Sequence, residues 1–234
     1  MPCSLEEESI LDSLVKYLSQ ALRNEDISLT KQGSGDGRTN SSLDERKISQ
    51  ALRLYAHANE RFKELGMSLD ISPPRYWHDF LVSSEKTKVW LPVNVKITAM
   101  KGQDNVSSKE GLYYALTGRK PENESLNTWE RYCTALSEHV DLDAKSDYYF
   151  LVVSKNSPGH VFWTSLKRLC HIVPNGNNPP FQCNWGENQT RIERPANEAA
   201  KMLLETLGET FRLRAEAWHS FQRTLAPKLA LLGD

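Results

Sequence analysis

The stretch YWHDFLVSSEKTKVWLPVNVKIT, residues 76–98, decides the fold. It predicts two strands, over residues 76–83 and 88–98, joined by a polar turn. Every other residue from Val89 to Ile97 is aliphatic, which is typical of a strand with one face in the core. Pro92 interrupts this strand and cannot donate a ladder hydrogen bond, so we expect a bulge or a sheet edge at that position.

Helices are expected on both sides of this hairpin. A capping box, Ser4 to Glu7, opens an amphipathic helix, and a second one, Ser42 to Glu45, is expected to open a helix that stops at Gly66. A Gly/Ser/Asn-rich loop at 30–42 separates them. The remaining predicted elements are helices at 107–117 and about 125–140, a strand buried on both faces at 148–154, a mostly loop segment at 156–194, and a long helix from Pro195.

These elements predict an α/β fold with a central mixed β-sheet flanked by helices. The length of 234 residues suits a single domain, 1–234. We divide it into an N-terminal helical segment at 1–30, a core at 43–155, a loop-rich segment at 156–194 and a C-terminal helix at 195–234.

Composition excludes several classes of protein. The chain has 29 Lys+Arg and 30 Asp+Glu, a net charge of -1, and a mean hydropathy of -0.56. It is therefore not a histone-like or basic-arm protein, although a local basic surface remains possible. No apolar run approaches the roughly 18 residues that span a bilayer, and the N-terminus lacks the pattern of a secretory signal.

The four cysteines predict neither a disulfide framework nor a zinc site. They are widely spaced and form no CxxC pair: Cys3, Cys133, Cys170 and Cys183. Neutral thiols in a reducing cytosol are the expected state.

Three polar residues of the hairpin can form a catalytic site. Asn94 and Lys96 are two residues apart, so both side chains leave the same face of their strand. Asp79, on the neighbouring strand, is placed to lie near them. An Asp, a second oxygen ligand and a Lys around one point can hold a divalent metal and a water, because Mg²⁺ prefers oxygen ligands and keeps several waters.

Asp79 followed by Asn94-Val-Lys96 resembles the PD-(D/E)xK signature of type II restriction endonucleases. The stretches WLPVNVKIT, GLYYALTG and NPPFQCNW are also similar to a group of these enzymes, and the resemblance covers residues 43–185. His78-Asp79 stands where the family has Pro-Asp, and Asn94 stands where it has Asp or Glu. An amide brings no charge, so Asn94 is a native ligand of a variant site, an inactivating substitution, or a sign that the match is accidental.

The resemblance implies a metal site and a role for each of its residues. Asp79 and Asn94 would hold Mg²⁺ (with Mn²⁺ as a possible substitute), the Val95 carbonyl would be a further ligand, and Lys96 would handle the attacking water. The family often adds an acid from a preceding helix, for which Glu45 is the candidate. His78 is expected to be structural.

Base recognition needs forked donors and acceptors on exposed loops. Two segments carry the candidates for DNA contact. One follows the second strand directly, and the other is the loop-rich region, which has a small excess of basic over acidic residues. The candidates are Lys101, Gln103, Asp104, Asn105 and Lys109, then Lys155, Asn156, His160, Lys167, Arg168, Asn177, Asn178, Gln182, Asn184 and Arg191. Trp163 and Trp185 lie among polar residues and could contact DNA or a partner, whereas Trp129, Trp218 and Phe221 are expected in the core.

The resemblance thus implies a Mg²⁺-dependent, site-specific deoxyribonuclease. It would act on double-stranded DNA at a short, palindromic site and leave 5′-phosphate ends. A homodimer without nucleotide cofactor or membrane contact, in the cytoplasm of a prokaryote, is expected. The alternatives are another nuclease of the same fold, acting in repair or on modified DNA, a DNA-binding protein with a decayed site, and an interaction protein in which Asp79 and Lys96 form only a structural ion pair.

Overall fold

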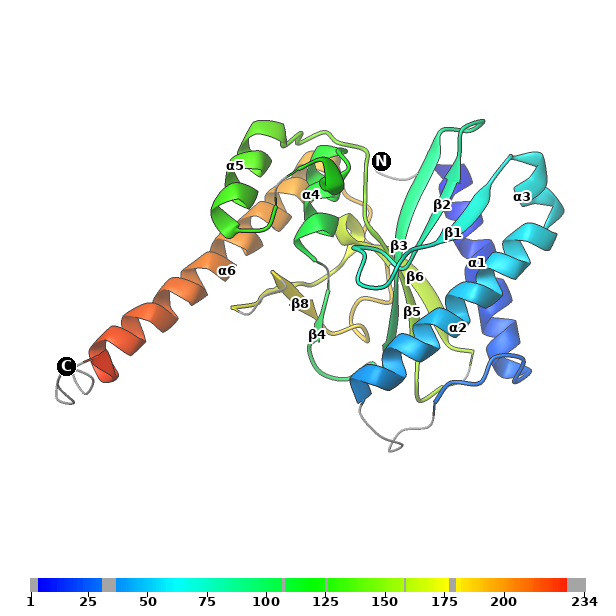
Figure 1. Ribbon diagram of the computed structural model, residues 1–234, viewed down its shortest axis with the longest axis horizontal. Helices are drawn as coiled ribbons and strands as arrows, with labels where there is room; N and C mark the ends of the chain where they lie inside the picture. Colours follow the sequence, from blue (N-terminus) through cyan, green and yellow to red (C-terminus); the bar gives the residue numbers. More distant parts are fainter. Residues whose placement is uncertain are drawn as a thin grey trace.

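A five-stranded mixed sheet lies at the centre of the computed structural model (Figure 1), which describes residues 4–30, 37–106, 108–124, 126–157, 159–176 and 180–226, with only the helical backbone for 37–42. Its strand order is β1-β2-β3-β5-β6. The strands are β1 (Ser68–Ile71), β2 (Phe80–Ser84), β3 (Val89–Thr98), β5 (Tyr149–Ser154) and β6 (Val161–Ser165). Neighbouring strands are antiparallel except β3 and β5, which are parallel.

A smaller three-stranded sheet and six α-helices complete the described chain. The small sheet has the order β4-β8-β7, from β4 (Asp104–Asn105), β7 (Val173–Pro174) and β8 (Phe181–Cys183). The helices are α1 (Leu5–Arg23), α2 (Gly37–Ala58), α3 (Glu60–Glu64), α4 (Lys109–Thr117), α5 (Trp129–His139) and α6 (Ala196–Thr224), with 3-10 turns at Pro121–Asn123 and Leu166–Arg168. The predicted α/β class with a helix-flanked mixed sheet is confirmed.

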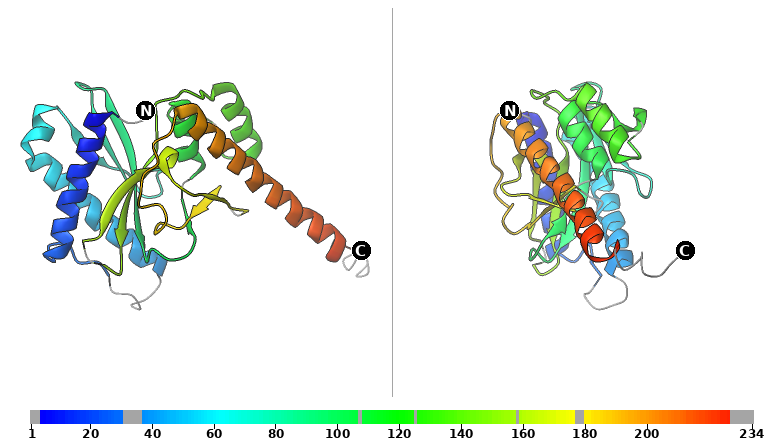
Figure 2. Two further views of the ribbon diagram at one scale, coloured as in Figure 1. Left: turned by 180° about the vertical axis from the view of Figure 1, so that it is seen from behind. Right: turned by 90° about the vertical axis from the view of Figure 1, so that its left-hand side faces the viewer.

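Two hydrophobic clusters form the core, one on each face of the large sheet. The aliphatic face of β3 packs with α1 and α2, while α4, α5 and the first half of α6 cover the other face (Figure 2). The β5 run YFLVVS is buried along its whole length, as expected for a strand between two helical layers. Pro92 pairs only with Leu81 of β2, because the parallel pairing of β3 with β5 begins at Val93. The edge expected at this proline therefore exists on its β5 side.

Several predicted boundaries were wrong. The strand expected at 76–83 begins at Phe80, because Pro73, Pro74 and the left-handed Arg75 (φ 68°) turn the preceding chain. The helix expected at 43 begins at Gly37, so Ser42 lies inside α2 and does not cap it. Glu45 is thereby released from the expected capping box. The capping box of Ser4 and Glu7 is confirmed.

The segment 156–194, expected as mostly loop, contains β6, β7, β8 and a 3-10 turn. Trp163 on β6 and Trp185 after β8 are both 1% exposed, so neither can contact DNA or a partner. Conversely, α6 extends beyond the body of the molecule (Figure 1), and Trp218 on its outer half is 58% exposed and stacks on Phe221. The expected core position of Trp218 was wrong, because the apolar spacing of α6 continues past the surface that it could pack against.

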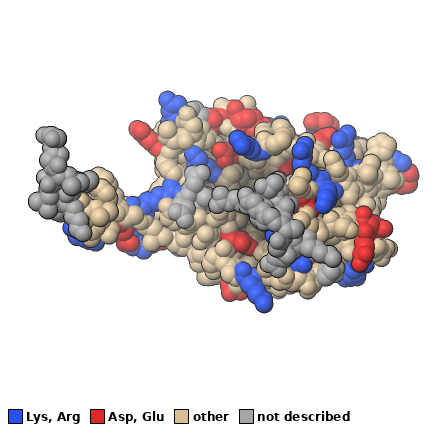
Figure 3. Space-filling model, turned by 60° about the horizontal axis from the view of Figure 1, so that its bottom comes forward, with Lys and Arg blue, Asp and Glu red and all other residues tan. Residues whose placement is uncertain are grey.

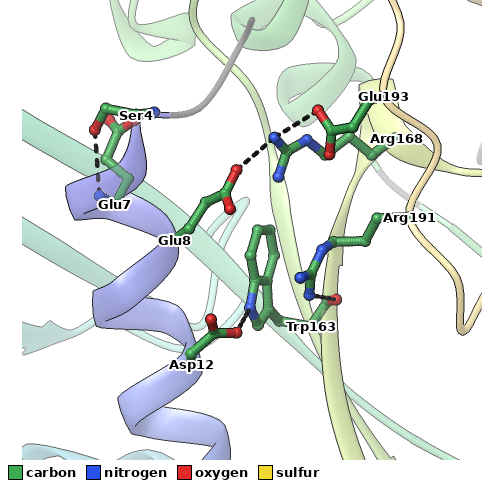
Figure 4. Close-up of polar contacts among 8 residues, drawn as sticks. All are labelled: Ser4, Glu7, Glu8, Asp12, Trp163, Arg168, Arg191 and Glu193. Atoms are coloured by element: carbon green, nitrogen blue, oxygen red, sulfur yellow. Dashed lines mark hydrogen bonds and ion pairs between the residues drawn. The ribbon is translucent and has the colours of Figure 1, made fainter.

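Charged residues fix α1 to β6 and the chain that follows it (Figure 4). The Arg168 guanidinium, 1% exposed, forms ion pairs with Glu8 (2.7 Å) and Glu193 (2.9 Å). The Trp163 indole donates a hydrogen bond of 2.6 Å to the Asp12 carboxylate, and Arg191 lies 4.0 Å from the centre of the indole ring. The contacts of Asp12 and Glu8 join residues 151 and 160 positions apart.

Asp12→Ala should lower the free energy of unfolding by about 1–3 kcal/mol, because it leaves the indole N–H of buried Trp163 without its acceptor. Chemical denaturation at pH 7 measures this change. Lys16→Ala, on an exposed position of the same helix, is the matched control and should change stability by less than about 0.5 kcal/mol. Equal losses in both variants would show that the bond contributes nothing beyond helix propensity.

Candidate active site

Asp79 is held against β3 by two hydrogen bonds. Its backbone N–H donates to the Val93 carbonyl (2.9 Å), and its carboxylate Oδ2 accepts from the Val95 N–H (2.6 Å). Val93 and Val95 flank Asn94, so these two bonds hold Asp79 beside the β3 backbone at Asn94. Burial raises the pKa of Asp79, and the Val95 N–H and the charge of Lys96 oppose that rise.

Glu45 reaches the same place from α2. Burial and the charge of Asp79 raise the pKa of Glu45 to about 7, against the opposing charges of Lys96 and Lys155. Glu45 and Asp79 also line one hollow, so two carboxylates from different elements lie in the same region of the structure. Their mutual repulsion is a cost that a nearby cation would relieve.

Lys96 is half-buried on β3, and its charge lowers the pKa of both carboxylates. Desolvation lowers the pKa of its amine, while Asp79, Glu45, Cys183 and Asp104 raise it. No nitrogen–oxygen contact of 4.0 Å or less joins Lys96 to Asp79 or Glu45 in the described part of the chain. The three groups therefore interact electrostatically across a gap.

Asn94 presents an unsatisfied oxygen. Its amide hydrogen-bonds to the phenol oxygen of Tyr148, which in turn donates to the Trp77 carbonyl. Its Oδ1 is buried and has no hydrogen-bond partner among the described residues. A buried polar atom without a partner is rare and calls for an explanation, such as an ion or a water.

These groups fit a hard divalent cation. Two carboxylates, a partnerless amide oxygen and the backbone of Val95 provide oxygen donors, which Mg²⁺ prefers. The Val95 carbonyl points to the same side of β3 as its N–H, toward Asp79, because both groups of one residue face the same neighbour in a sheet. The described residues contain no group of three Asp, Glu, His or Cys side chains that could hold a metal ion.

Two hollows meet at Glu45. One, of about 300 Å³, is lined by Asp79, Arg46 and the loop 71–76, and the other, of about 180 Å³, by Lys96, Asp104 and Asn105. Figure 3 shows the lower face of the molecule, which carries both basic and acidic side chains. The lining of the two hollows includes three cations, Arg46, Arg75 and Lys96, beside three acids, and these cations suit an anionic ligand.

Most exposed candidates for DNA contact surround this face. Lys101 and Gln103 are exposed in the loop after β3, and Asn105 lines the smaller hollow. Lys155 is exposed after β5 and close enough to Glu45 to lower its pKa. Asn156 is also exposed, with its amide on the Ala99 carbonyl (3.2 Å), and His160 is half-buried.

Other candidates have internal roles. Asp104 accepts from the Thr98 hydroxyl (2.6 Å), and Asn184 accepts from Gly186 in a turn. Lys109 donates to the Leu126 carbonyl (2.6 Å) and lies over the Trp129 ring. Arg191 packs on Trp163.

Two cations proposed for DNA contact are buried, and that assignment is corrected here. Lys167 is 0% exposed and donates to the Ala144 carbonyl beside Asp147, while Arg168 is bound by Glu8 and Glu193. A loop-rich segment suggested solvated cations, but its chain folds back into the sheet. Asn177 and Asn178 lie outside the described residues.

The loop before β2 adds residues that sequence reasoning missed. Arg46, Arg75 and Tyr76 line the larger hollow next to Asp79. The Ser72-Pro-Pro-Arg75 sequence directly before Asp79 was the available indication, because a rigid loop ahead of a catalytic residue places its side chains at the site. His78, expected to be structural, is 5% exposed and bonds to Ser72 (2.7 Å), and burial lowers its pKa to about 4.

A scan against protein-family models and a search of curated proteins found no match for this chain. The described residues include no helix with the length and apolar character needed to cross a membrane.

Glu45→Gln should stabilise the protein at pH 8 and have no such effect near pH 4. The pKa of Glu45 is about 7 in the folded chain and 4.5 in the unfolded chain, so the folded state loses stability as pH rises from 4.5 through 7. A neutral glutamine removes this loss. Denaturation midpoints measured from pH 4 to 8 test the prediction, and a constant difference across that range would contradict it.

Proposed function

We propose that this protein is a type II restriction endonuclease that hydrolyses double-stranded DNA with Mg²⁺ at a short, palindromic site and leaves 5′-phosphate ends. One observation carries the proposal: Glu45 shares one hollow with Asp79 and a second with Lys96 and Asn105. Asn94, two residues before Lys96 on β3, has a buried side-chain oxygen without a partner among the described residues. The PD-(D/E)xK resemblance of the same residues supports it, as does the helix-flanked mixed sheet.

Each residue has a role in this proposal. Glu45, Asp79, Asn94 through Oδ1 and the Val95 carbonyl would hold Mg²⁺, which when bound offsets charge on the scissile phosphate and the leaving oxygen. Lys96 orients the attacking water, and its lowered pKa eases the release of a proton from the amine. Lys155, Arg46 and Arg75 are placed to contact phosphates beside the site.

Digestion of a sequenced plasmid, with the ends mapped, tests the proposal. We expect discrete fragments in Mg²⁺ or Mn²⁺, none in EDTA, and ends that a ligase can join without prior phosphorylation. Discrete fragments from unmodified DNA would also distinguish this function from a repair or modification-dependent nuclease. Absence of any cleavage in either metal would overturn the proposal.

The neutral Asn94 supports a second candidate, a DNA-binding protein with a decayed site. An amide holds Mg²⁺ more weakly than a carboxylate. In this candidate, Asn94 has replaced an acid that the site needs for cleavage. This candidate predicts a DNA mobility shift at low salt without cleavage. An interaction protein unrelated to nucleases predicts neither.

A palindromic site also implies a homodimer, because two-fold protein symmetry then matches two-fold DNA symmetry. Light scattering of the free protein and of the DNA complex measures the stoichiometry. Two chains per duplex are expected. The cytoplasm of a prokaryote is the expected location for such an enzyme.

A further inference from the structure

Three amide side chains form a connected group on the small sheet beside the active site. Asn105 of β4 and Gln182 of β8 are directly opposite each other in the antiparallel register. The Asn105 Oδ1 accepts two hydrogen bonds, one from the Gln182 amide (3.3 Å) and one from the Asn175 amide (3.2 Å). We call Asn105, Asn175 and Gln182 the amide group.

The amide group is anchored at one end and exposed at the other. Asn175 is 4% exposed, and its backbone N–H donates to the Pro180 carbonyl (3.0 Å) and to Thr210 of α6 (3.2 Å). Asn105 is exposed and Gln182 is half-buried. A buried anchor fixes the Asn105 oxygen, and that oxygen then fixes the orientation of the Gln182 amide.

This orientation leaves a defined pair of groups on Gln182. One N–H is used by Asn105, so a second N–H and the Oε1 remain, and no described residue donates to that Oε1. Rotating the amide by half a turn would place two carbonyl oxygens against each other. The exposed edge of Gln182 therefore presents one acceptor and one donor in a fixed order.

We propose that Gln182 recognises an adenine in the major groove and that Asn105 is its positioning residue. Adenine presents an N6 donor next to an N7 acceptor, which complement the Oε1 and the remaining N–H of Gln182. Guanine presents two acceptors, O6 and N7, and would set its O6 against Oε1. The inference depends on the proposed function, since it assumes that double-stranded DNA is the substrate.

The adenine lies close to the bond that is cut. Asn105 lines the same hollow as Glu45 and Lys96, so the recognised base belongs to the nucleotides nearest the scissile phosphate. Asn105 follows β3 directly through residues 99–103, which couples base recognition to the proposed catalytic strand.

Cleavage of a randomised duplex library by the full chain tests the inference. We expect the wild-type recognition site to contain an adenine, and we expect the preference of the enzyme for adenine over guanine at that position to fall about 10- to 100-fold in Gln182→Ala. Asn105→Leu should weaken the preference for adenine at the same position and leave the other positions of the site unchanged. Gln189→Ala, an exposed glutamine bonded only within its own turn, is the matched control and should leave the site unchanged.

A nucleobase analogue keeps the test independent of folding. Replacing that adenine with 7-deazaadenine removes the N7 acceptor and should slow wild-type cleavage to a similar extent, with no further loss in Gln182→Ala. Specific cleavage that is insensitive to both changes would overturn this inference while the proposed function stands. A protein that neither binds nor cuts DNA would overturn both.

Discussion

Lys96→Ala should reduce Mg²⁺-dependent cleavage of plasmid DNA by about 10³-fold. Positioned acid–base groups contribute about 10²–10⁴-fold, and Lys96 lines the same hollow as Glu45. Burial lowers the pKa of its amine, which eases the release of a proton. Single-turnover rates at saturating enzyme measure the loss without a contribution from DNA affinity.

Two further variants separate catalysis from folding. Lys96→Met keeps the volume of the side chain and should be as inactive as the alanine variant. Lys63→Ala, on an exposed lysine of α3 outside the proposed DNA contacts, should remain active. Removing the Lys96 charge should also raise the pKa of Glu45 further above about 7, because that charge lowers it. Full activity of a folded Lys96→Ala protein would refute the assignment of Lys96.

The central hairpin was predictable because alternation defines both the strand and its faces. β3 begins within one residue of its expected start, and the face opposite its aliphatic row carries Asn94 and Lys96. The convergence of Asp79 with Lys96 followed from pairing two adjacent strands. Glu45 was proposed as a metal ligand because the neutral Asn94 leaves the site short of negative charge. The expected start of its helix was wrong.

The burial of charged side chains was not predictable from local sequence. Arg168 pairs with Glu8, 160 positions away, and Lys167 lies beside Asp147. Such partners are set by the path of the chain, which turns residues 161–168 into sheet and 3-10 structure rather than loop. The same limit applies to Trp218, since an amphipathic spacing gives no information on where the core ends.

The partnerless oxygen of Asn94 was likewise visible only in three dimensions. From sequence, the amide was a departure from the family pattern. In the structure, Tyr148 engages the amide, and Oδ1 is left without a donor among the described residues, as the proposed metal-binding role of Asn94 requires. Whether a strand amide is satisfied depends on neighbours such as Tyr148, which lies 54 positions along the chain.

Asp79→Asn should lower the cleavage rate by about 10³-fold or more while making the free protein more stable at pH 7. The activity falls because charge stabilisation by a bound metal amounts to several kcal/mol, and each 1.36 kcal/mol is tenfold in rate. The fold is retained because an asparagine oxygen can still accept the Val95 N–H. Cleavage rates and denaturation curves of the same preparation measure both effects.

The sign of the stability change distinguishes a catalytic carboxylate from a structural one. Burial raises the pKa of Asp79 above its usual 3.8. The folded protein therefore loses stability as pH rises from 3.8 through the raised pKa, because the buried carboxyl becomes ionised. Its charge also raises the pKa of Glu45, so Asp79→Asn should lower the Glu45 pKa below about 7. A structural ion pair with Lys96 predicts the opposite, a destabilised variant. Asp70→Asn, on an exposed position of β1, is the control and should change neither activity nor stability.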